Sequence, residues 1–359
     1  MKFHASIITL LSLIAILNAC KPKPIPGNPS VSVSVDDSVY LGYFQQNTGM
    51  IAGQGGQSMS LSDGRTLWLF SSAHLNDFTG GIFSCNPNAH NAAMVQSASN
   101  VFQTLNTGNT DFIPCGENGS WFRPLGAYQF LDTVFVFAKK EGSNTNAMTY
   151  IAKIHFPDLQ YVRIDSMNLY NTHYGYNVVA DTVEGFCYIY GLRQANVNQN
   201  NEVYLARIPM NDVHGIWLYY SNGSWFNPPS SASSLLSVPG ENFSIRKVKG
   251  KYVVLTQDGG QQCNQISHLY SRISSYAWGP FNNLVQLHEI KDRLSNVYAQ
   301  TSGASLHPQF INGKNQILVT YSINGYSPCL NTCASGMDNP DYYRTKAIRI
   351  DLKNIDSGL

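Results

Sequence analysis

Short apolar segments, each opened by a turn, recur along the chain. Five of them occupy residues 63–70, 131–140, 184–193, 250–259 and 313–322, and successive segments begin between 53 and 68 residues apart. Each has Gly or Asp in its first two positions and continues with large aliphatic, β-branched or aromatic residues. Such runs indicate β-hairpins, whereas helical periodicity is scarce. The pattern predicts an all-β protein.

The regular interval between these segments indicates how the strands are arranged into sheets. Roughly 60 residues accommodate a four-stranded sheet, and such sheets repeated around an axis form a β-propeller. We therefore predict a five-bladed β-propeller, with residues 342–352 as the last strand where the ring closes on the first blade. Two tandem β-sandwiches are the alternative. They would need a linker near residue 200, and residues 194–201 are interpreted instead as a loop.

A second repeat is the string Asn-Gly-Ser-Trp-Phe-x-Pro, found at residues 118–124 and 222–228. Asn-Gly favours a hairpin turn because both residues tolerate positive φ, and Trp and Phe then begin a strand. The copies start 104 residues apart (222 minus 118), which is less than two of the intervals above. They are therefore interpreted as hairpins at non-equivalent positions. Trp121 and Trp225 are candidates for stacking on sugars, with packing between blades as the alternative.

The first 37 residues differ from the rest. Lys2 and His4 precede an apolar stretch from Ser6 to Leu17, which has the length of a signal peptide and is too short for a membrane span. Residues 17–20, Leu-Asn-Ala-Cys, match the lipobox of bacterial lipoproteins. We predict a lipoprotein signal peptide at 1–19, lipidation of Cys20, a Pro- and Ser-rich tether at 20–37 and a single propeller domain at 38–359. An ordinary secretory signal is the alternative.

Charge and composition narrow the choice of partners. The chain has 23 basic and 22 acidic residues, a net charge of +1, which gives no case for nucleic-acid binding. Few charges together with many Tyr, Asn, Ser and Gly suit an extracytoplasmic β-protein that contacts carbohydrate. We expect a monomer in the cell envelope, anchored by lipid in the outer membrane and either periplasmic or surface-exposed, with a glycan as its partner.

Beyond Cys20, six cysteines remain. Outside the cytoplasm an even number permits three disulfides, and the connectivity stays open among Cys85, Cys115, Cys187, Cys263, Cys329 and Cys333. No second CxxC motif or nearby His pair supports a zinc site, and no Asp-rich loop supports Ca²⁺. We expect no metal and no cofactor.

Several strings resemble a known family when they are taken in order. They include GQGGQSMSLSDGRTLWLFSSAHLND at 53–77, HNAAMVQ at 90–96, SWFRPLGAYQFLDTVFVF at 120–137 and SLHPQFINGKNQILVTYSING at 305–325. Together they resemble a family of secreted bacterial domains, including lipoproteins, of unknown function. The resemblance covers about residues 40–355. It implies a five-bladed β-propeller with the architecture of glycoside hydrolases of the arabinofuranosidase and fructosidase type.

The same resemblance points to missing acids. Glycoside hydrolysis usually needs two carboxyl groups, and the family pattern would place Asp at three positions facing the central funnel. This chain instead has Gly-Gln-Gly-Gly-Gln at 53–57, Ser-Ser-Ala at 71–73 and Pro-Leu-Gly-Ala at 124–127. None of these side chains is an acid or base at neutral pH. The resemblance therefore implies that this machinery is lost.

Some polar residues persist at positions that match the family. Glu241 is the candidate catalytic acid. His307 is alternatively a structural histidine that is hydrogen-bonded in the core. Arg344 alternatively pairs with Glu241 or holds the closing strand in place. No Gly-x-Ser-x-Gly, HExxH or P-loop motif is present. The candidate ligand-binding residues are His90, Asn91, Trp121, Trp225, His307 and Arg344.

Three functions follow as hypotheses. The preferred one is a lipoprotein whose propeller binds glycan without hydrolysing it, because the acids are lost while these aromatic residues remain: Trp121, Phe122, Tyr174, Trp225, Tyr276 and Trp278. The second is a glycoside hydrolase that uses acids elsewhere, such as Asp111, Asp181, Glu184 and Glu241. The third is a protein-interaction scaffold in an outer-membrane complex, with a plugged funnel and an apolar rim.

Overall fold

The computed structural model describes residues 34–78, 83–143, 148–169, 171–193, 200–258, 264–294, 296–325, 337–338 and 340–359. By their contacts, residues 32–359 form one compact unit. The predicted signal peptide, Cys20 and most of the predicted tether lie outside the described residues and remain predictions. Within the described part of the chain, no helix is long and apolar enough to cross a membrane.

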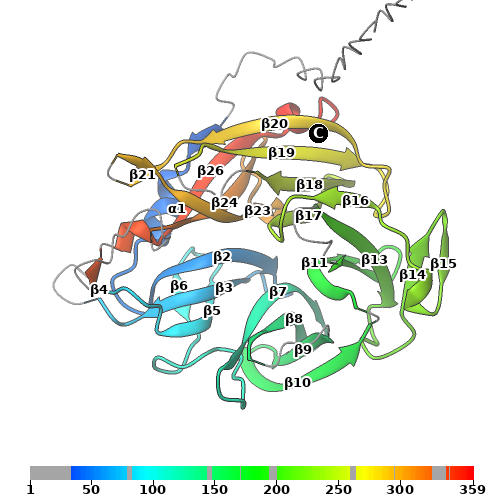
Figure 1. Cartoon of the computed structure of the whole chain (residues 1–359), viewed down its shortest axis with the longest axis horizontal. Helices are drawn as coiled ribbons and strands as arrows, with labels where there is room; N and C mark the ends of the chain where they lie inside the picture. The colour runs from blue at the N-terminus through cyan, green and yellow to red at the C-terminus, as the bar shows by residue number, and fades with distance from the viewer. Residues whose placement is uncertain are drawn as a thin grey trace, which may run out of the picture. The chain divides into compact units, whose positions relative to one another are not determined.

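Five antiparallel sheets are arranged around a common axis (Figure 1). From the axis outward, the first blade has β2 (Met50–Ser60), β3 (Thr66–Leu75), β5 (Ala89–Gln96) and β6 (Phe102–Thr104). The second has β7 (Ser120–Phe130), β8 (Thr133–Gly142), β9 (Met148–His155) and β10 (Gln160–Asn168). The third has β11 (His173–Asp181), β12 (Phe186–Arg193), β13 (Asn201–Pro209), β14 (Leu218–Ser221) and β15 (Ser224–Phe226), with β16 (Leu236–Val238) also paired to β13.

The last two blades complete the ring. The fourth has β17 (Phe243–Val248), β18 (Lys251–Gln257), β19 (Ser267–Ser274) and β20 (Asn282–Ile290), and the fifth has β23 (Gln300–His307), β24 (Gln316–Asn324), β26 (Thr345–Asp351) and β1 (Ser34–Asp36). Contacts between blades run mainly through the inner strands β2, β7, β11, β17 and β23. The remaining elements are β4 (Phe83–Ser84) with β25 (Met337–Asp338), β21 (Arg293–Leu294) with β22 (Val297–Tyr298), the helices α1 (Ser38–Tyr43) and α2 (Leu352–Ile355), and 3-10 turns at Pro229–Ser231, Pro308–Phe310 and Pro340–Tyr342.

The five recurring segments of the sequence are the second strands of the five blades. They contain β3, β8, β12, β18 and β24, each with the turn that leads into it. A second strand is flanked by strands on both sides and packs against a neighbouring blade on each face, so it reads as a nearly continuous apolar run. Residues 67–70 of β3, for example, are all buried. The predicted five-bladed all-β propeller is confirmed.

The hydrophobic core lies between neighbouring blades. One cluster joins Leu67 and Leu69 of the first blade to Val134 and Val136 of the second. Another cluster connects the second, third and fourth blades. Two more connect the fourth blade to the fifth and the fifth blade to the first. Burial between blades therefore supplies most of the apolar stabilisation.

The ring is closed by the N-terminal strand. β1 pairs antiparallel with β26, Ser34 opposite Ile350 and Asp36 opposite Ile348. Residues 34–36, which the sequence interpretation placed in the tether, thus belong to the fifth blade. Strand 345–351 likewise belongs to the fifth blade and not to the first. The first segment of the described chain and the last strand together hold the ring shut.

We expect Asp37→Ala to destabilise the protein by about 2–3 kcal/mol. The Asp37 carboxylate accepts hydrogen bonds from the amides of Val39 and Tyr40, which caps α1, and it pairs with Arg349 at 2.5 Å. Both partners of this ion pair are largely buried, with 9% and 12% of their side chains exposed. Urea unfolding measures the effect. Asp63→Ala is the matched control, because its pair with Arg65 is exposed; an equal loss in both variants would contradict this role of Asp37.

The cysteine pairing differs from the expectation of three disulfides. Cys85 is disulfide-bonded, whereas Cys115 and Cys187 are free thiols. Cys263, Cys329 and Cys333 lie outside the described residues. Cys187 points into the core around the third blade, where it acts as a small apolar side chain and burial raises its pKa. With two thiols free, at most two disulfides can form among the six cysteines.

Candidate functional site

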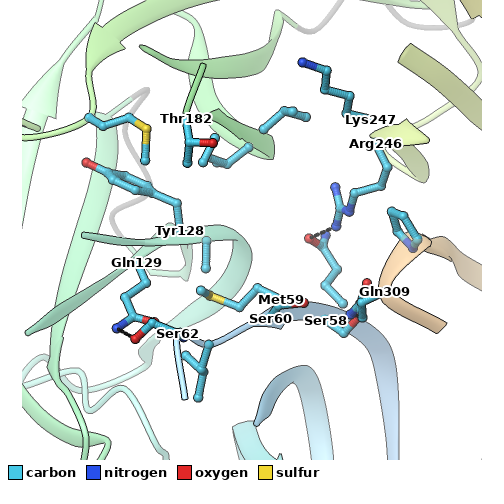
Figure 2. Close-up of a pocket in the computed structure, with 18 of the residues that line it drawn as sticks. Ser58, Met59, Ser60, Ser62, Tyr128, Gln129, Thr182, Arg246, Lys247 and Gln309 are labelled. Atoms are coloured by element: carbon cyan, nitrogen blue, oxygen red, sulfur yellow. Dashed lines mark hydrogen bonds between the residues drawn. The ribbon is translucent and has the colours of Figure 1, made fainter. Parts of the chain in front are cut away.

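Two cavities lie along the axis of the propeller, each lined by residues from all five blades. The N-side cavity, of about 330 Å³, is lined mainly by residues of the inner strands and the segments just before them, with Leu69, Ser71 and Glu141 from second strands. The C-side cavity, of about 690 Å³, is lined by the last residues of the inner strands and the turns that follow (Figure 2). Gln57, Leu69 and Leu125 line both cavities, so the two meet at the middle of the axis.

Irregular strand pairing shapes the N-side cavity. Four of the five inner strands shift register against their second strands, between Gly53 and Gln57, Pro124 and Ala127, Tyr174 and Asn177, and Ser302 and Ser305. A bulge of this kind re-aims side chains and bends the strand. Each shift includes or adjoins residues that line this cavity. Gly303 in the last bulge has a φ of +69°, and a Cβ there would lie 3.2 Å from the Cα of Gly55.

An ion-pair cluster fills one side of the N-side cavity. Arg123 on β7 pairs through its Nε with Glu141 at 2.8 Å and through Nη2 with Glu241. Lys139 donates to Glu241 at 2.7 Å and lies 3.8 Å from Glu141. Lys139 and Glu141 share one face of β8, where Lys139 is opposite Arg123 and Glu141 is opposite Trp121 in the register. Glu241 comes from the segment before β17. The cluster therefore ties the second blade to the fourth.

The charges of this cluster determine its protonation. Burial acts against ionisation of Glu241, but Arg123 and Lys139 outweigh it and lower the pKa of Glu241 from 4.5 to about 2. Burial also acts to lower the pKa of Arg123, and Tyr176, Glu241 and Glu141 instead raise it. At neutral pH Glu241 is therefore an ionised acceptor with no proton to donate.

The three positions where the family resemblance implied Asp fall around the same cavity. Gln54 and Gln57 represent the first position, Ser71 the second and Leu125 the third, and all four line the N-side cavity. The rest of the lining includes Tyr176, Asn242, Ser302 and Ser305, with the Arg123 guanidinium 5.7 Å from the centre of the Tyr176 ring. Amides and a hydroxyl thus occupy the first two of these positions, and the apolar Leu125 occupies the third.

A family model described as "Domain of unknown function (DUF5005)" matches residues 37–352. The chain belongs to this family. The match runs from the cap of α1 to the end of β26, so it covers every strand of the five blades except β1. The resemblance to a propeller family of unknown function is thereby confirmed. No curated protein matches the DUF5005 chain.

Solved structures resemble this DUF5005 chain at low identity. A "putative hydrolase" from Bacteroides ovatus is 17% identical with a TM-score of 0.67, over 90% of this chain and 93% of the other. A GH43_1 enzyme from Xanthomonas citri, complexed with xylotriose, is 11% identical with a TM-score of 0.49, over 89% of each chain. An exo-β-1,3-galactanase from Phanerochaete chrysosporium is 12% identical with a TM-score of 0.48, over 88% of this chain and 64% of the other. The first of these supports the propeller fold.

Two of the predicted ligand-binding residues of the DUF5005 chain, His90 and Trp121, lie side by side. Their rings stack with centres 4.7 Å apart, and His90 is held by Asp111 through its backbone amide and its Nδ1. A Cβ on Gly142 would lie 2.7 Å from Cζ3 of the Trp121 ring. His90 therefore covers one face of Trp121, and neither side chain lines the cavities.

Asn91 and His307 are structural in this DUF5005 fold, which corrects the expectation that they contact ligand. Both are fully buried. The Asn91 amide donates to the carbonyls of Ile113 and Phe122 and accepts from the Ile113 amide, joining the first and second blades. His307 hydrogen-bonds Ser58 through Nδ1 and Thr320 through Nε2 at 2.8 Å. Burial holds its pKa well below 6.5, so the ring is neutral.

Arg344 and Trp225 also lie outside the cavities of the DUF5005 domain. Arg344 pairs with Asp341 at 2.6 Å and donates to the carbonyl of Gln46, so it clamps the chain near the closing strand and does not contact Glu241. Trp225 lies on the outermost strand β15 of the third blade, with the Arg207 guanidinium 4.2 Å from the centre of its ring. Neither side chain faces a cavity of the described residues.

The two copies of the Asn-Gly string are not equivalent in this DUF5005 chain, as expected. The second forms the β14–β15 hairpin, with positive φ at Asn222 and Gly223. The first lies between the first and second blades, where Gly119 has positive φ and β7 begins at Ser120. The expectation of a hairpin is therefore confirmed only for the second copy.

The other acids named for a hydrolase lie apart from Glu241 in the DUF5005 structure. Asp111 holds His90, Glu184 accepts from the Tyr188 hydroxyl, and Asp181 is buried and paired with Lys247. Sequence reasoning missed Arg123, Lys139 and Glu141. The alternation of Lys139 and Glu141 at the end of an otherwise apolar strand was a usable signal. Among the described residues, no three His, Cys, Asp or Glu side chains gather as metal ligands.

Proposed function

We propose that the N-side cavity binds a glycan and does not hydrolyse it. The observation that carries this proposal is the state of its carboxylates: Arg123 pairs with both Glu141 and Glu241, and Lys139 pairs with Glu241 as well. A glycosidase needs one carboxylic acid that is protonated when the substrate is bound. With its pKa near 2, Glu241 does not meet this need at neutral pH.

The chemistry of the lining supports a sugar as the ligand. Amide and hydroxyl groups that line the cavity, such as Gln54, Ser71 and Asn242, match the hydroxyl groups of a sugar, and the fixed carboxylates add strong acceptors. A cavity of about 330 Å³ lies at the lower end of the range for small-molecule sites. We infer that one or two sugar units are held there. The predicted lipobox at Cys20 extends the proposal to a propeller anchored in the cell envelope.

A glycan array run beside a screen for reducing-sugar release tests this function. We expect retained glycans, no released sugar, and binding about tenfold weaker in Gln54→Leu, which removes one amide from the cavity. Gln129→Leu, at the C-side cavity, is the matched control with unchanged binding. Release of reducing sugar that is lost in Glu241→Gln would overturn the proposal.

A glycoside hydrolase is the second candidate, because Arg123 brings Glu141 and Glu241 into one cavity. It requires that substrate binding displace Arg123 from one carboxylate so that a proton can be taken up. Loss of sugar release in both Glu141→Gln and Glu241→Gln would favour it. The scaffold hypothesis expected a plugged channel, whereas cavities of about 330 and 690 Å³ lie along the axis.

A further inference from the structure

The C-side cavity contains a cation without a counter-ion. Arg246 on β17 lines it, and no carboxylate of the described chain lies within ion-pair distance of its guanidinium. Nη1 donates to Oδ1 of Asn177 at 2.8 Å and to the carbonyl of Ile245 at 2.9 Å, and Nη2 makes a long contact of 3.4 Å with Oε1 of Gln57. Among the described residues, the Nε hydrogen and one Nη2 hydrogen find no acceptor.

Several other enclosed cations of the protein are compensated by carboxylates. Arg123 has two carboxylates, Arg349 pairs with Asp37, and Lys247, which also lines the C-side cavity, pairs with Asp181. An enclosed guanidinium that meets only neutral acceptors is unfavourable unless further groups compensate it. Burial alone lowers the pKa of Arg246 to about 10, with no nearby carboxylate acting against it.

The walls around Arg246 are suited to a small anion. No Asp or Glu is among the residues that line this cavity. Figure 2 shows Arg246 and Gln309 on one side, with Tyr128 and Gln129 across the cavity and Ser58, Ser60 and Met59 along its base. Serine and glutamine side chains supply donors beside the guanidinium, and Met59, Leu61 and Val178 supply apolar surface. At about 690 Å³ the cavity has room for a ligand of sugar size.

We propose that the C-side cavity binds a small organic anion whose carboxylate or sulfate group sits on Arg246. The planar guanidinium suits such a group because adjacent N–H donors can engage two of its oxygens. In the N-side cavity Arg123 is already paired with two carboxylates, so its guanidinium is not available to the same ligand. This inference is independent of the proposed glycan site, and either can fail without the other.

Titration calorimetry on the full protein tests this, with glucuronate as the carboxylate probe, sulfate as the inorganic probe and glucose as the neutral probe. We expect binding of glucuronate or sulfate but not of glucose, and affinity lower by about tenfold or more in Arg246→Met. Arg193→Met is the matched control: that arginine also contacts only neutral acceptors, Thr172 and Tyr204, and lies outside both cavities. Binding of glucuronate with sulfate inactive identifies an organic carboxylate, and the reverse identifies a sulfate group.

A second measurement needs no variant. The Nε–H resonance of Arg246 in a ¹⁵N-labelled sample should shift when the bound probe is titrated in. Arg246→Lys keeps the positive charge but loses the paired N–H donors of the guanidinium, so it should bind the anionic probes more weakly than the wild type. This variant keeps the test possible if Arg246→Met does not fold. Failure of both glucuronate and sulfate to bind would overturn the inference, as would equal affinity in the wild type, Arg246→Met and Arg246→Lys.

Discussion

Replacing Arg123 by methionine is expected to destabilise the folded protein by about 3–5 kcal/mol at neutral pH. The substitution keeps most of the side-chain volume but removes the cation that pairs with Glu141 and Glu241. Glu241 then stays in a largely buried position with Lys139 as its remaining strong partner. Because burial opposes its ionisation, the pKa of Glu241 should rise from about 2 toward that of an ordinary glutamate. Urea unfolding gives the first quantity and an NMR titration the second.

The same ion pairs predict how the free energy of unfolding changes with pH. A carboxylate whose folded pKa is lowered binds protons more weakly when folded, so its stabilising effect is present above pH 4.5 and is lost as the pH falls toward 2. For Glu241 in the wild type this effect amounts to about 3 kcal/mol, because its pKa falls from 4.5 to about 2 on folding. In Arg123→Met, most of this decline between pH 4.5 and 2 should disappear.

Two further variants separate an ion-pair effect from simple loss of packing. In Arg123→Met/Glu241→Gln the uncompensated carboxylate is gone, so the double variant should be more stable than Arg123→Met alone, with a coupling energy of about 2–3 kcal/mol. Arg163→Met is the matched control, because Arg163 is 60% exposed in its pair with Asp165 and should lose less than about 1 kcal/mol. Equal losses in Arg123→Met and Arg163→Met would refute the central role of the cluster.

The architecture was predictable because the second strands repeat at regular intervals. The turn and apolar run at 131–140 become β8, and those at 313–322 become β24, since a strand packed on both faces needs apolar residues throughout. The closing strand was not predictable in the same way. β1 has only three residues, 34–36, and they are mostly exposed, so no alternation of apolar and polar residues marks them as a strand. Only their pairing with β26 makes them one.

The site was predictable in one residue and not in its partners. Glu241 was selected because it survives where other acids are lost, and it lies in the N-side cavity. Its contact with Arg123 spans 118 residues and two blades, so it exists only once the ring has formed. Local patterns do not encode such a contact. Arg246 was missed for the same reason, because the absence of a carboxylate near its guanidinium is known only from the folded structure.

Aromatic residues show how composition can mislead. The abundance of Trp and Tyr suggested sugar stacking, yet Trp68 is fully buried among Tyr40, Phe44 and Phe310. Tyr174 is likewise buried against Trp217. Wide wedges between diverging blades need large side chains to fill them, and aromatic rings do this efficiently. Aromatic residues, which can also bind sugars, are therefore buried between the blades of this ring.

His307→Gln is expected to reduce stability by about 2–4 kcal/mol near pH 7.5. The ring is fully buried, its two nitrogens hydrogen-bond Ser58 and Thr320, and its centre lies 4.8 Å from the centre of the Trp68 ring in a tilted contact. A glutamine side chain does not reproduce two hydrogen bonds in opposite directions across a planar ring, so at least one buried hydroxyl loses its partner. His90→Gln is the control, since His90 has 55% of its side chain exposed and should change stability little.

The stronger test of His307 is its pH dependence. Because its folded pKa lies well below 6.5, the unfolded chain takes up the proton first, so acidification below pH 6.5 favours unfolding. Each such histidine contributes a slope of about 1.4 kcal/mol per pH unit. His173 and His288, whose pKa values burial also lowers, add to this slope in the wild type.

His307→Gln should therefore lower the free energy of unfolding at high pH but flatten its fall between about pH 6.5 and 5 by one proton. The window ends there because carboxylates begin to titrate below it, and Glu241 keeps its charge to a pH near 2. Urea unfolding at several pH values in this range measures both effects. If His307→Gln kept the full wild-type slope, His307 would have to take up its proton in the folded state, which is incompatible with a sealed neutral ring close to Arg246 and Arg349.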